Sequence, residues 1–211
     1  MLDSKTVRGF VDELASNSPA PGGGSVAALC GSLGSALGSM VFNLTVGKKA
    51  YEALGDAEKA SVNKGLKDAG ELKDTFLDLM NKDTEAFNKL MAAFKLPKDT
   101  DENKAARTAQ IQAAYKAATE IPLEVARRAY DIYELIEIAV DHGNKNAISD
   151  AGVAALLAQA SIEGAIMNVK INLGSIKDEE FVNAVRDEIK VISEDGLKKQ
   201  QEILQEVNKQ L

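Results

Sequence analysis

The sequence predicts an all-α protein, a single domain over residues 1–211 that forms a bundle of about six helices with two apolar helices at its centre. Apolar residues recur at helical spacing along nearly the whole chain, and the alternation typical of β-strands is absent. Clusters of glycine and proline interrupt this spacing at few places, so the helices between them are long. No internal repeat, low-complexity segment or linker divides the chain.

The first two predicted helices flank the glycine-rich break "SNSPAPGGG". Ser4 is a candidate N-cap for the first helix. Its inner face is expected to consist of Val7, Phe10, Val11 and Leu14. The second helix is expected from about Ser25 to Lys48 and should be one of the two central helices, because it is almost free of charge.

Four further helices complete the predicted bundle. A long third helix begins after Gly55 and ends near Pro97, and a long fourth helix continues to about Asp141. The fifth helix, roughly 148–173, is again rich in small apolar residues and is the second central helix. The last helix begins near Asp178 and reaches the C-terminus, and its many charges place it on the outside.

Composition limits the classes of function. The net charge is −7 and the pI is near 4.9, and no basic stripe interleaved with aromatics exists, so nucleic acid is not an expected partner. Cys30 is the only cysteine, which excludes an internal disulfide and, with a charged N-terminus unlike a secretory signal, favours the cytoplasm. His142 is the only histidine, so no multi-histidine metal site is expected.

Residues 26–46 form a charge-free run that is long enough to cross a bilayer, and Gly34 and Gly38 form a GxxxG pair within it. About half of the run is Gly, Ser, Ala, Asn or Thr, so it is only mildly hydrophobic, and no second clean span follows. A buried central helix that packs closely through its small residues explains the run better than a membrane span. No membrane is therefore expected as a partner.

The glycine run matches the sequence motif of a nucleotide-binding fingerprint but lacks the structural context that the motif requires. Gly22, Gly24 and Ala27 satisfy G-x-G-x-x-G/A, but a helix and prolines precede them where a strand is required, and no lysine suits a P-loop. Glycines before a helix allow backbone N–H groups to converge on an acceptor, which Ser25 can also bind. The alternative is a plain turn between two helices.

Two positions carry acids beside apolar helix faces. Asp83 and its neighbour Glu85 lie inside the third helix, where burial of Asp83 would raise its pKa, or where Asp83 instead pairs on the surface with Lys82 or Lys89. Asp150 begins the fifth helix, where it is either a proton-transfer group or a partner for the helix dipole.

Amides and lysines supply candidate binding groups. Asn168 and Asn172 share one helix face, and Asn43 lies in the apolar second helix. Such amides either bond to neighbouring backbone or bind a heterocycle such as a pterin. Lys48 and Lys49 end the charge-free run and either bind a carboxylate or cap a solvated helix end.

Three sequence blocks in this order resemble the cyclodeaminase/cyclohydrolase family, which includes the C-terminal half of the animal formiminotransferase-cyclodeaminase. The blocks are "PAPGGGSVAALCGSLGSALGSMVFNLTVGKK", "DTEAFNKLMAAFKLPKDTDENKAARTAQIQAAYKAATEIPLEVA" and "GNKNAISDAGVAALLAQASIEGAIMNVKINL". The resemblance covers nearly the whole chain and weakens after about Asn183. The glycine run alone would be a weak signal, whereas the ordered set is specific.

This resemblance implies an all-α enzyme of tetrahydrofolate metabolism that works as a homodimer or larger assembly, without a metal or any cofactor beyond its folate substrate. The favoured activity closes 5-formimidoyltetrahydrofolate to 5,10-methenyltetrahydrofolate with release of ammonia. The alternative opens 5,10-methenyltetrahydrofolate with water to 10-formyltetrahydrofolate. A second alternative is a helical folate-binding or adaptor module without catalysis.

The resemblance also implies roles for individual residues. The family's loop at the head of the second helix corresponds to Gly22, Gly23, Gly24 and Ser25. Its basic positions correspond to Lys48 and Lys49, and its acidic pair corresponds to Asp83 and Glu85. Its Asn and Asp positions further along the chain correspond to Asn144, Asp150, Asn168 and Asn172. We expect Asp83 or Asp150 to transfer a proton, Asn168 and Asn172 to hold the pterin, and Lys48 to meet a glutamate or polyglutamate tail.

Overall fold

The computed structural model describes residues 1–211 as seven α-helices and one short 3-10 helix, without a strand. The helices are α1 (Val7–Leu14), α2 (Gly23–Asn43), α3 (Lys49–Glu52), α4 (Asp56–Phe94), α5 (Asp101–His142), η1 (Lys145–Ala147), α6 (Ile148–Leu173) and α7 (Glu179–Gln210). The all-α prediction is confirmed. One α-helix more than expected is present because the four-residue α3 forms between α2 and α4.

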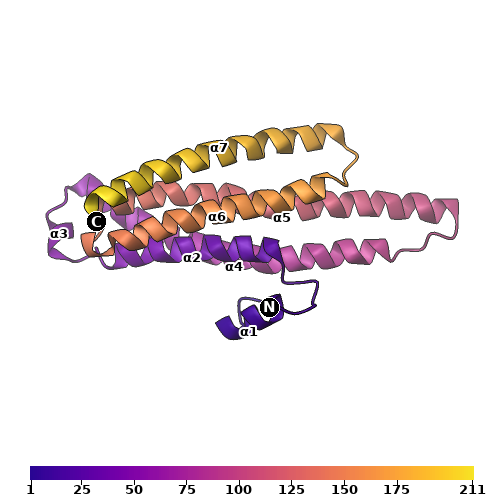
Figure 1. The fold of residues 1–211 in the computed structure, drawn as a ribbon, viewed down its shortest axis with the longest axis horizontal. Helices are drawn as coiled ribbons and strands as arrows, with labels where there is room; N and C mark the ends of the chain where they lie inside the picture. Colours follow the sequence, from indigo (N-terminus) through magenta and orange to yellow (C-terminus); the bar gives the residue numbers. More distant parts are fainter.

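Helices α2 and α6 form the centre of the bundle, as the sequence predicts. They pack against each other and against α4 and α5, and α7 covers α5 and α6 (Figure 1). Glycines allow the close approach: a Cβ on Gly31 of α2 would lie 2.5 Å from the ring of Phe76, and one on Gly65 of α4 would lie 2.6 Å from the ring of Phe42. Interior packing of this density leaves no room for a larger residue at either position.

Length and apolar composition would allow two segments, Gly23–Asn43 and Lys145–Leu173, to cross a membrane, so the expectation that no second such span follows the first is wrong. They contain the two central helices, and 56% of the most apolar window in each is buried inside the chain. The core of a helical bundle requires this composition. The apolar side chains of these two segments that are not buried, such as Leu33 and Leu156, lie on the outer faces of α2 and α6.

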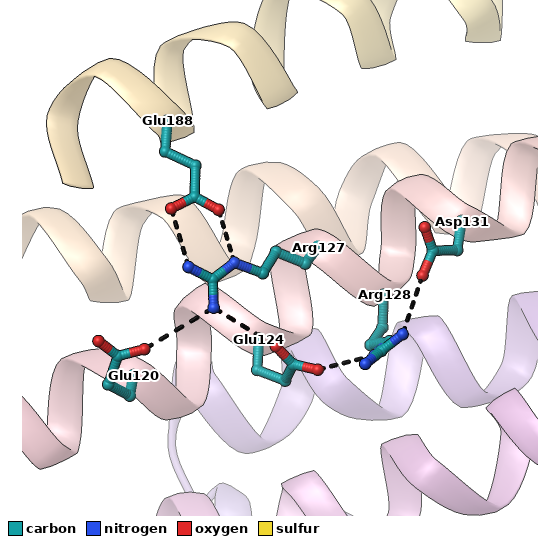
Figure 2. Close-up of polar contacts among 6 residues, drawn as sticks. All are labelled: Glu120, Glu124, Arg127, Arg128, Asp131 and Glu188. Carbon is teal, nitrogen blue, oxygen red and sulfur yellow. Dashed lines mark hydrogen bonds and ion pairs between the residues drawn. The ribbon is translucent and has the colours of Figure 1, made fainter. Parts of the chain in front are cut away.

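Helix α7 is fastened to α5 by a network of charges (Figure 2). Arg127 of α5 binds both carboxylate oxygens of Glu188 on α7, with one N–O distance of 2.8 Å, and Glu124 bridges Arg127 and Arg128. The hydrogen bonds from Arg127 hold the pKa of Glu188 below its usual range. These side chains are partly exposed, so the network orients α7 more than it stabilises the fold.

Two details of the N-terminal half differ from expectation. Only Phe10 of the predicted inner face of α1 is buried, whereas Val7 is 85% exposed, and Thr6 rather than Ser4 is the N-cap. Helix α2 ends at Asn43 instead of Lys48, because Gly47, at φ +71, turns the chain into α3.

Helices α4 and α5 are the longest pair and extend as a hairpin beyond the ends of α2 and α6 (Figure 1). The first residues of α2 and the last residues of α6 therefore meet the sides of α4 and α5 partway along their length. The loop from α1 to α2 runs past the same place. The bundle therefore narrows where α2 begins and α6 ends, and we call this change in thickness the step. The cavity described next lies at the step.

Candidate functional site

A cavity of about 420 Å³ lies where α2 begins and α6 ends against the α4–α5 hairpin. We call it the step cavity. Its wall combines the α1–α2 loop with one face each of α4, α5 and α6, namely Pro19, Ala20, Gly22, Gly23, Gly24, Asp83, Thr84, Phe87, Leu90, Met91, Phe94, Tyr115, Ala118, Asn168, Ile171, Asn172 and Ser175. Six of the thirteen residues proposed from the sequence line it, and a seventh, Ser25, hydrogen-bonds to one of them.

The glycine loop meets the carboxylate of Asp83. The Ser25 hydroxyl donates a hydrogen bond to Asp83 Oδ2 over 2.9 Å. A Cβ on Gly24 would lie 2.3 Å from Asp83 Oδ1, so only glycine lets the carboxylate approach the start of α2. A helix N-terminus offers unpaired N–H groups and a favourable dipole to such an anion. The acceptor that this helix start binds within the chain is therefore Asp83.

The pKa of Asp83 is raised. Burial of the carboxyl is the main cause, because it disfavours the charged form, and hydrogen bonding from Ser25 opposes part of the effect. A carboxyl with a raised pKa is easier to protonate than an exposed aspartate, which suits a group that must accept a proton and return it. Asp83 thus combines position and protonation behaviour in a way that suits acid–base chemistry.

Both asparagines of the cavity keep part of their hydrogen-bonding capacity free. Asn168 Nδ2 donates to Gly164 O over 2.8 Å, and Asn172 Nδ2 donates to Ala118 O over 3.0 Å. No hydrogen bond within the chain ends on either side-chain oxygen. The backbone thus holds the two amide groups in place, and their oxygens remain available as acceptors for a ligand. The two alternatives from the sequence, bonding to backbone and binding a heterocycle, are therefore compatible.

Thr84 adds an unpaired hydroxyl to the same wall. Its Oγ1 is buried and has no hydrogen-bond partner. The helical threonines Thr75, Thr108 and Thr119 instead donate to the carbonyl four residues earlier. A buried hydroxyl without a partner costs stability, so Thr84 is a polar group of the cavity wall whose hydrogen bond the chain leaves unmade.

The rest of the cavity is aromatic and apolar. The rings of Phe94 and Tyr115 meet edge to face with centroids 6.1 Å apart, and Phe87 and Met91 continue the wall along α4. Such a surface suits a flat ring. The cavity therefore has a polar end at Asp83 and an apolar end towards the tip of the hairpin.

Five other proposed residues lie at the opposite end of the bundle. Helix α2 separates Gly23 from Asn43 by about 30 Å, and α6 separates Asp150 from Asn168 by about 27 Å. Lys48 and Asn144 line a smaller cavity of about 310 Å³ there, and Lys49 is exposed on α3. The structure thus divides the proposed residues between two ends.

Glu85 lies on a third surface. It lines an alanine-rich groove between α4 and α5 with Lys82 and Lys89 at its rim, and not the step cavity beside Asp83. A separate groove along the same two helices is lined mainly by carboxylates, among them Asp68 and Asp131. Like charges there would repel an anionic ligand.

Sequence reasoning missed Thr84, Phe94 and Tyr115 as cavity residues. The signal for Phe94 was present, because positions 83, 87, 90 and 94 repeat at helical spacing and define one face of α4. Tyr115 had no such signal, since its neighbours across the cavity come from other helices.

The fold and the step cavity define a helical-bundle protein with a half-buried acid, free amide acceptors and an aromatic wall around one ligand-sized space. The sequence matches the family model described as formiminotransferase-cyclodeaminase over residues 6–191. The chain belongs to this family of folate cyclodeaminases and cyclohydrolases.

Individual relatives agree with this assignment. The methenyltetrahydrofolate cyclohydrolase of Methylorubrum extorquens is 44% identical over 181 residues, which cover 86% of this chain and 85% of that protein. The formimidoyltransferase-cyclodeaminase of Gallus gallus is 38% identical over 85% of this chain but only 32% of its own length. The structure of formiminotetrahydrofolate cyclodeaminase from Thermotoga maritima matches with a TM-score of 0.81 and 31% identity, over 100% of this chain and 98% of that one.

Proposed function

We propose that this chain is a methenyltetrahydrofolate cyclohydrolase that opens 5,10-methenyltetrahydrofolate with water to 10-formyltetrahydrofolate. The observation that carries the proposal is the half-buried Asp83 carboxyl, held by Ser25 at the polar end of the step cavity. The 44% identity to a cyclohydrolase of similar length favours this reaction. The order of preference is therefore the reverse of the one reached from sequence alone.

The polar end of the cavity suits a pterin. The amide edge of a pterin carries N–H donors, and the free side-chain oxygens of Asn168 and Asn172 accept such bonds. The Thr84 hydroxyl can bond the same ring. When the pterin occupies the polar end of the cavity, the aminobenzoyl ring lies against Phe94 and Tyr115, and the carbon between N5 and N10 lies near Asp83.

Asp83 supplies the proton transfers. As a carboxylate it takes a proton from the attacking water while oxygen bonds to the methenyl carbon, giving a tetrahedral intermediate. It then returns that proton to N5 as the carbon–N5 bond breaks, and the second proton of the original water leaves to solvent as the formyl C=O forms. The raised pKa of Asp83 favours the first of these transfers, because it makes the carboxylate a better proton acceptor.

The second candidate is formimidoyltetrahydrofolate cyclodeaminase, which the full-length match to the Thermotoga maritima structure favours. The same pose serves this reaction. Asp83 would take the N10 proton as N10 attacks the formimidoyl carbon, and would return it to the departing amine, which leaves as ammonia.

Purified protein with each folate distinguishes the candidates through the absorbance of the methenyl chromophore. Accelerated decay of 5,10-methenyltetrahydrofolate supports the cyclohydrolase. Growth of the chromophore from 5-formimidoyltetrahydrofolate, with one ammonia released per turnover, supports the cyclodeaminase instead. Binding without turnover of either folate would overturn both and leave a helical folate-binding module. Dialysis against a chelator should leave the rate unchanged, because the proposed steps use no metal.

We also propose that the protein is a cytoplasmic homodimer joined through the outer faces of α2 and α6. These adjacent faces expose Leu33, Leu156, Met167 and Ile171 by 48%, 50%, 68% and 75%. Burying such a patch favours association. Ile171 also lines the step cavity, so a partner on this face would narrow the cavity mouth. Light scattering should give twice the chain mass, and Leu156→Asp should give the monomer, whereas a monomeric wild type would contradict the proposal.

A further inference from the structure

Arg107 lies at the apolar end of the step cavity, at the tip of the α4–α5 hairpin. Its Nε and Nη2 donate to Phe94 O over 3.3 and 3.1 Å, and its guanidinium carbon lies 5.9 Å from the centre of the Phe94 ring. Phe94 is a cavity residue, so these contacts fix the cation beside the cavity.

The charge of Arg107 has no partner in the chain. No carboxylate lies within ion-pair distance of it, and its Nη1 makes no hydrogen bond. Arg127 and Arg128, by contrast, each bind two or more acids, in a protein with 32 acidic and 25 basic residues. An arginine that is partly buried, held in place and unpaired is prepared for an external carboxylate.

The cavity thus has three parts in a fixed order. Asp83 and the asparagines form the polar end, Phe94 and Tyr115 form the aromatic wall, and Arg107 is the cation beyond them. Tetrahydrofolate has a pterin, an aminobenzoyl ring and a glutamate in the same order. We propose that Arg107 binds a carboxylate of the folate glutamate tail, an inference that rests on the proposed function.

The spacing favours a tail of more than one glutamate. Eleven residues of α4 separate Asp83 from Phe94, which is about 16 Å along the helix. A γ-linked polyglutamate extends further from the reacting carbon than a single glutamate does, so it reaches Arg107 more easily. Lys48 and Lys49, the residues that the sequence predicts to bind the tail, lie at the other end of α2, about 30 Å from the cavity, so we assign the tail to Arg107 instead.

The test compares KM for three forms of the same substrate: the tail-free pteroate derivative, the monoglutamate and the triglutamate. Arg107→Gln should raise KM for the triglutamate about tenfold, as expected for loss of one charge-assisted hydrogen bond, with little change in kcat. KM for the tail-free form should stay within twofold. Arg107→Lys should recover part of the loss, and Arg186→Gln, which removes an exposed arginine on α7, should match the wild type.

Two results would overturn the proposal. An equal rise in KM for all three forms would mean that Arg107 only supports the hairpin through Phe94 O. Unchanged KM for the triglutamate would mean that the tail lies elsewhere. Both results are measured with a wild-type enzyme that converts folate. They can therefore be distinguished from failure of the proposed function, because in that case the wild type would convert none of the three substrates.

Discussion

The two ends of the bundle hold similar residue types but use them differently. At the far end, Asn144 donates from its backbone N–H to Thr45 Oγ1 and from Nδ2 to Leu44 O, and its Oδ1 accepts from Asn146. Lys145 likewise donates to two backbone carbonyls and to Gln210. At the step cavity, polar atoms of Thr84, Asn168 and Asn172 have no partner in the chain.

This contrast separates structural polar residues from binding ones. A polar group whose hydrogen bonds are all made within the chain stabilises the fold, whereas a buried one with a free atom costs stability unless a ligand completes it. The chemistry is therefore expected at the step cavity, whereas Asn144 and Lys145 support the fold at the far end. The following experiments test this division, beginning with the largest expected effect.

Replacement of Asp83 by Asn should lower kcat by roughly 1,000-fold, because it removes the proposed proton-transfer group while keeping its shape. Asp150→Asn, at the far end, should change kcat less than twofold. Steady-state kinetics of both variants with the same folate make the comparison, and an equal loss in the two would contradict the division between the ends.

Asp83→Asn should raise the stability of the fold although it lowers kcat. Burial raises the pKa of Asp83 in the folded protein, so its favourable contribution is complete below the unfolded carboxyl pKa and is lost as pH rises through the folded value. Asp83→Asn should therefore unfold at a higher urea concentration than wild type at neutral pH. The difference should shrink in acid, and a variant less stable at neutral pH would contradict this expectation.

Gly24→Ala should lower kcat by about 100-fold, because the new Cβ would displace the Asp83 carboxylate from Ser25. Gly38→Ala is the matched control on the same helix, since a Cβ there meets nothing within 4 Å and Gly38 does not line the step cavity. Similar activity in the two variants would show that the position of the carboxylate at the start of α2 is unimportant.

Ser25→Ala should move the acidic limb of the kcat/KM profile to higher pH. The Ser25 hydrogen bond lowers the pKa of Asp83 against the effect of burial, so its loss leaves the carboxyl harder to ionise. The pH profile of purified variant and wild type measures the shift. A limb that stays in place would assign it to another group.

Asn144→Ala should reduce the free energy of unfolding by about 1 to 2 kcal/mol, because the two hydrogen bonds of its side chain, to Leu44 O and from the Asn146 N–H, are lost. The activity per folded molecule should remain that of the wild type. Urea denaturation and kinetics on the same sample separate the two effects, and lost activity with normal stability would place part of the site at this end.

Periodicity along the sequence predicted the helices well. The expected fifth helix, 148–173, coincides with α6, and Asp178 is the N-cap of α7. The burial of α1 was predicted less well, because apolar spacing shows that a helix has an apolar face but not that another element covers it. Val7 illustrates this, being apolar and almost fully exposed.

Residue types indicated more candidates than one cavity can hold. Asp83 and Asn168 are far apart in sequence and meet only because α4 and α6 pack at the same level, which no local pattern encodes. Lys48 is closer to the glycine loop in sequence, yet the rigid α2 carries it to the other end. In a helical protein, a continuous helix turns short sequence separations into long distances.

In the proposed binding mode, the length of the projecting α4–α5 hairpin determines how long a ligand fits between Asp83 and Arg107, and it leaves the residues around the reacting carbon unchanged. Adding one turn to each arm would move Arg107 about 5.4 Å further from Asp83, and removing one would bring it closer. Neither change would disturb the packing of α2 and α6, which end before the tip. If Arg107 binds the tail as we propose, the length of this hairpin sets the distance between the reacting carbon and the tail carboxylate.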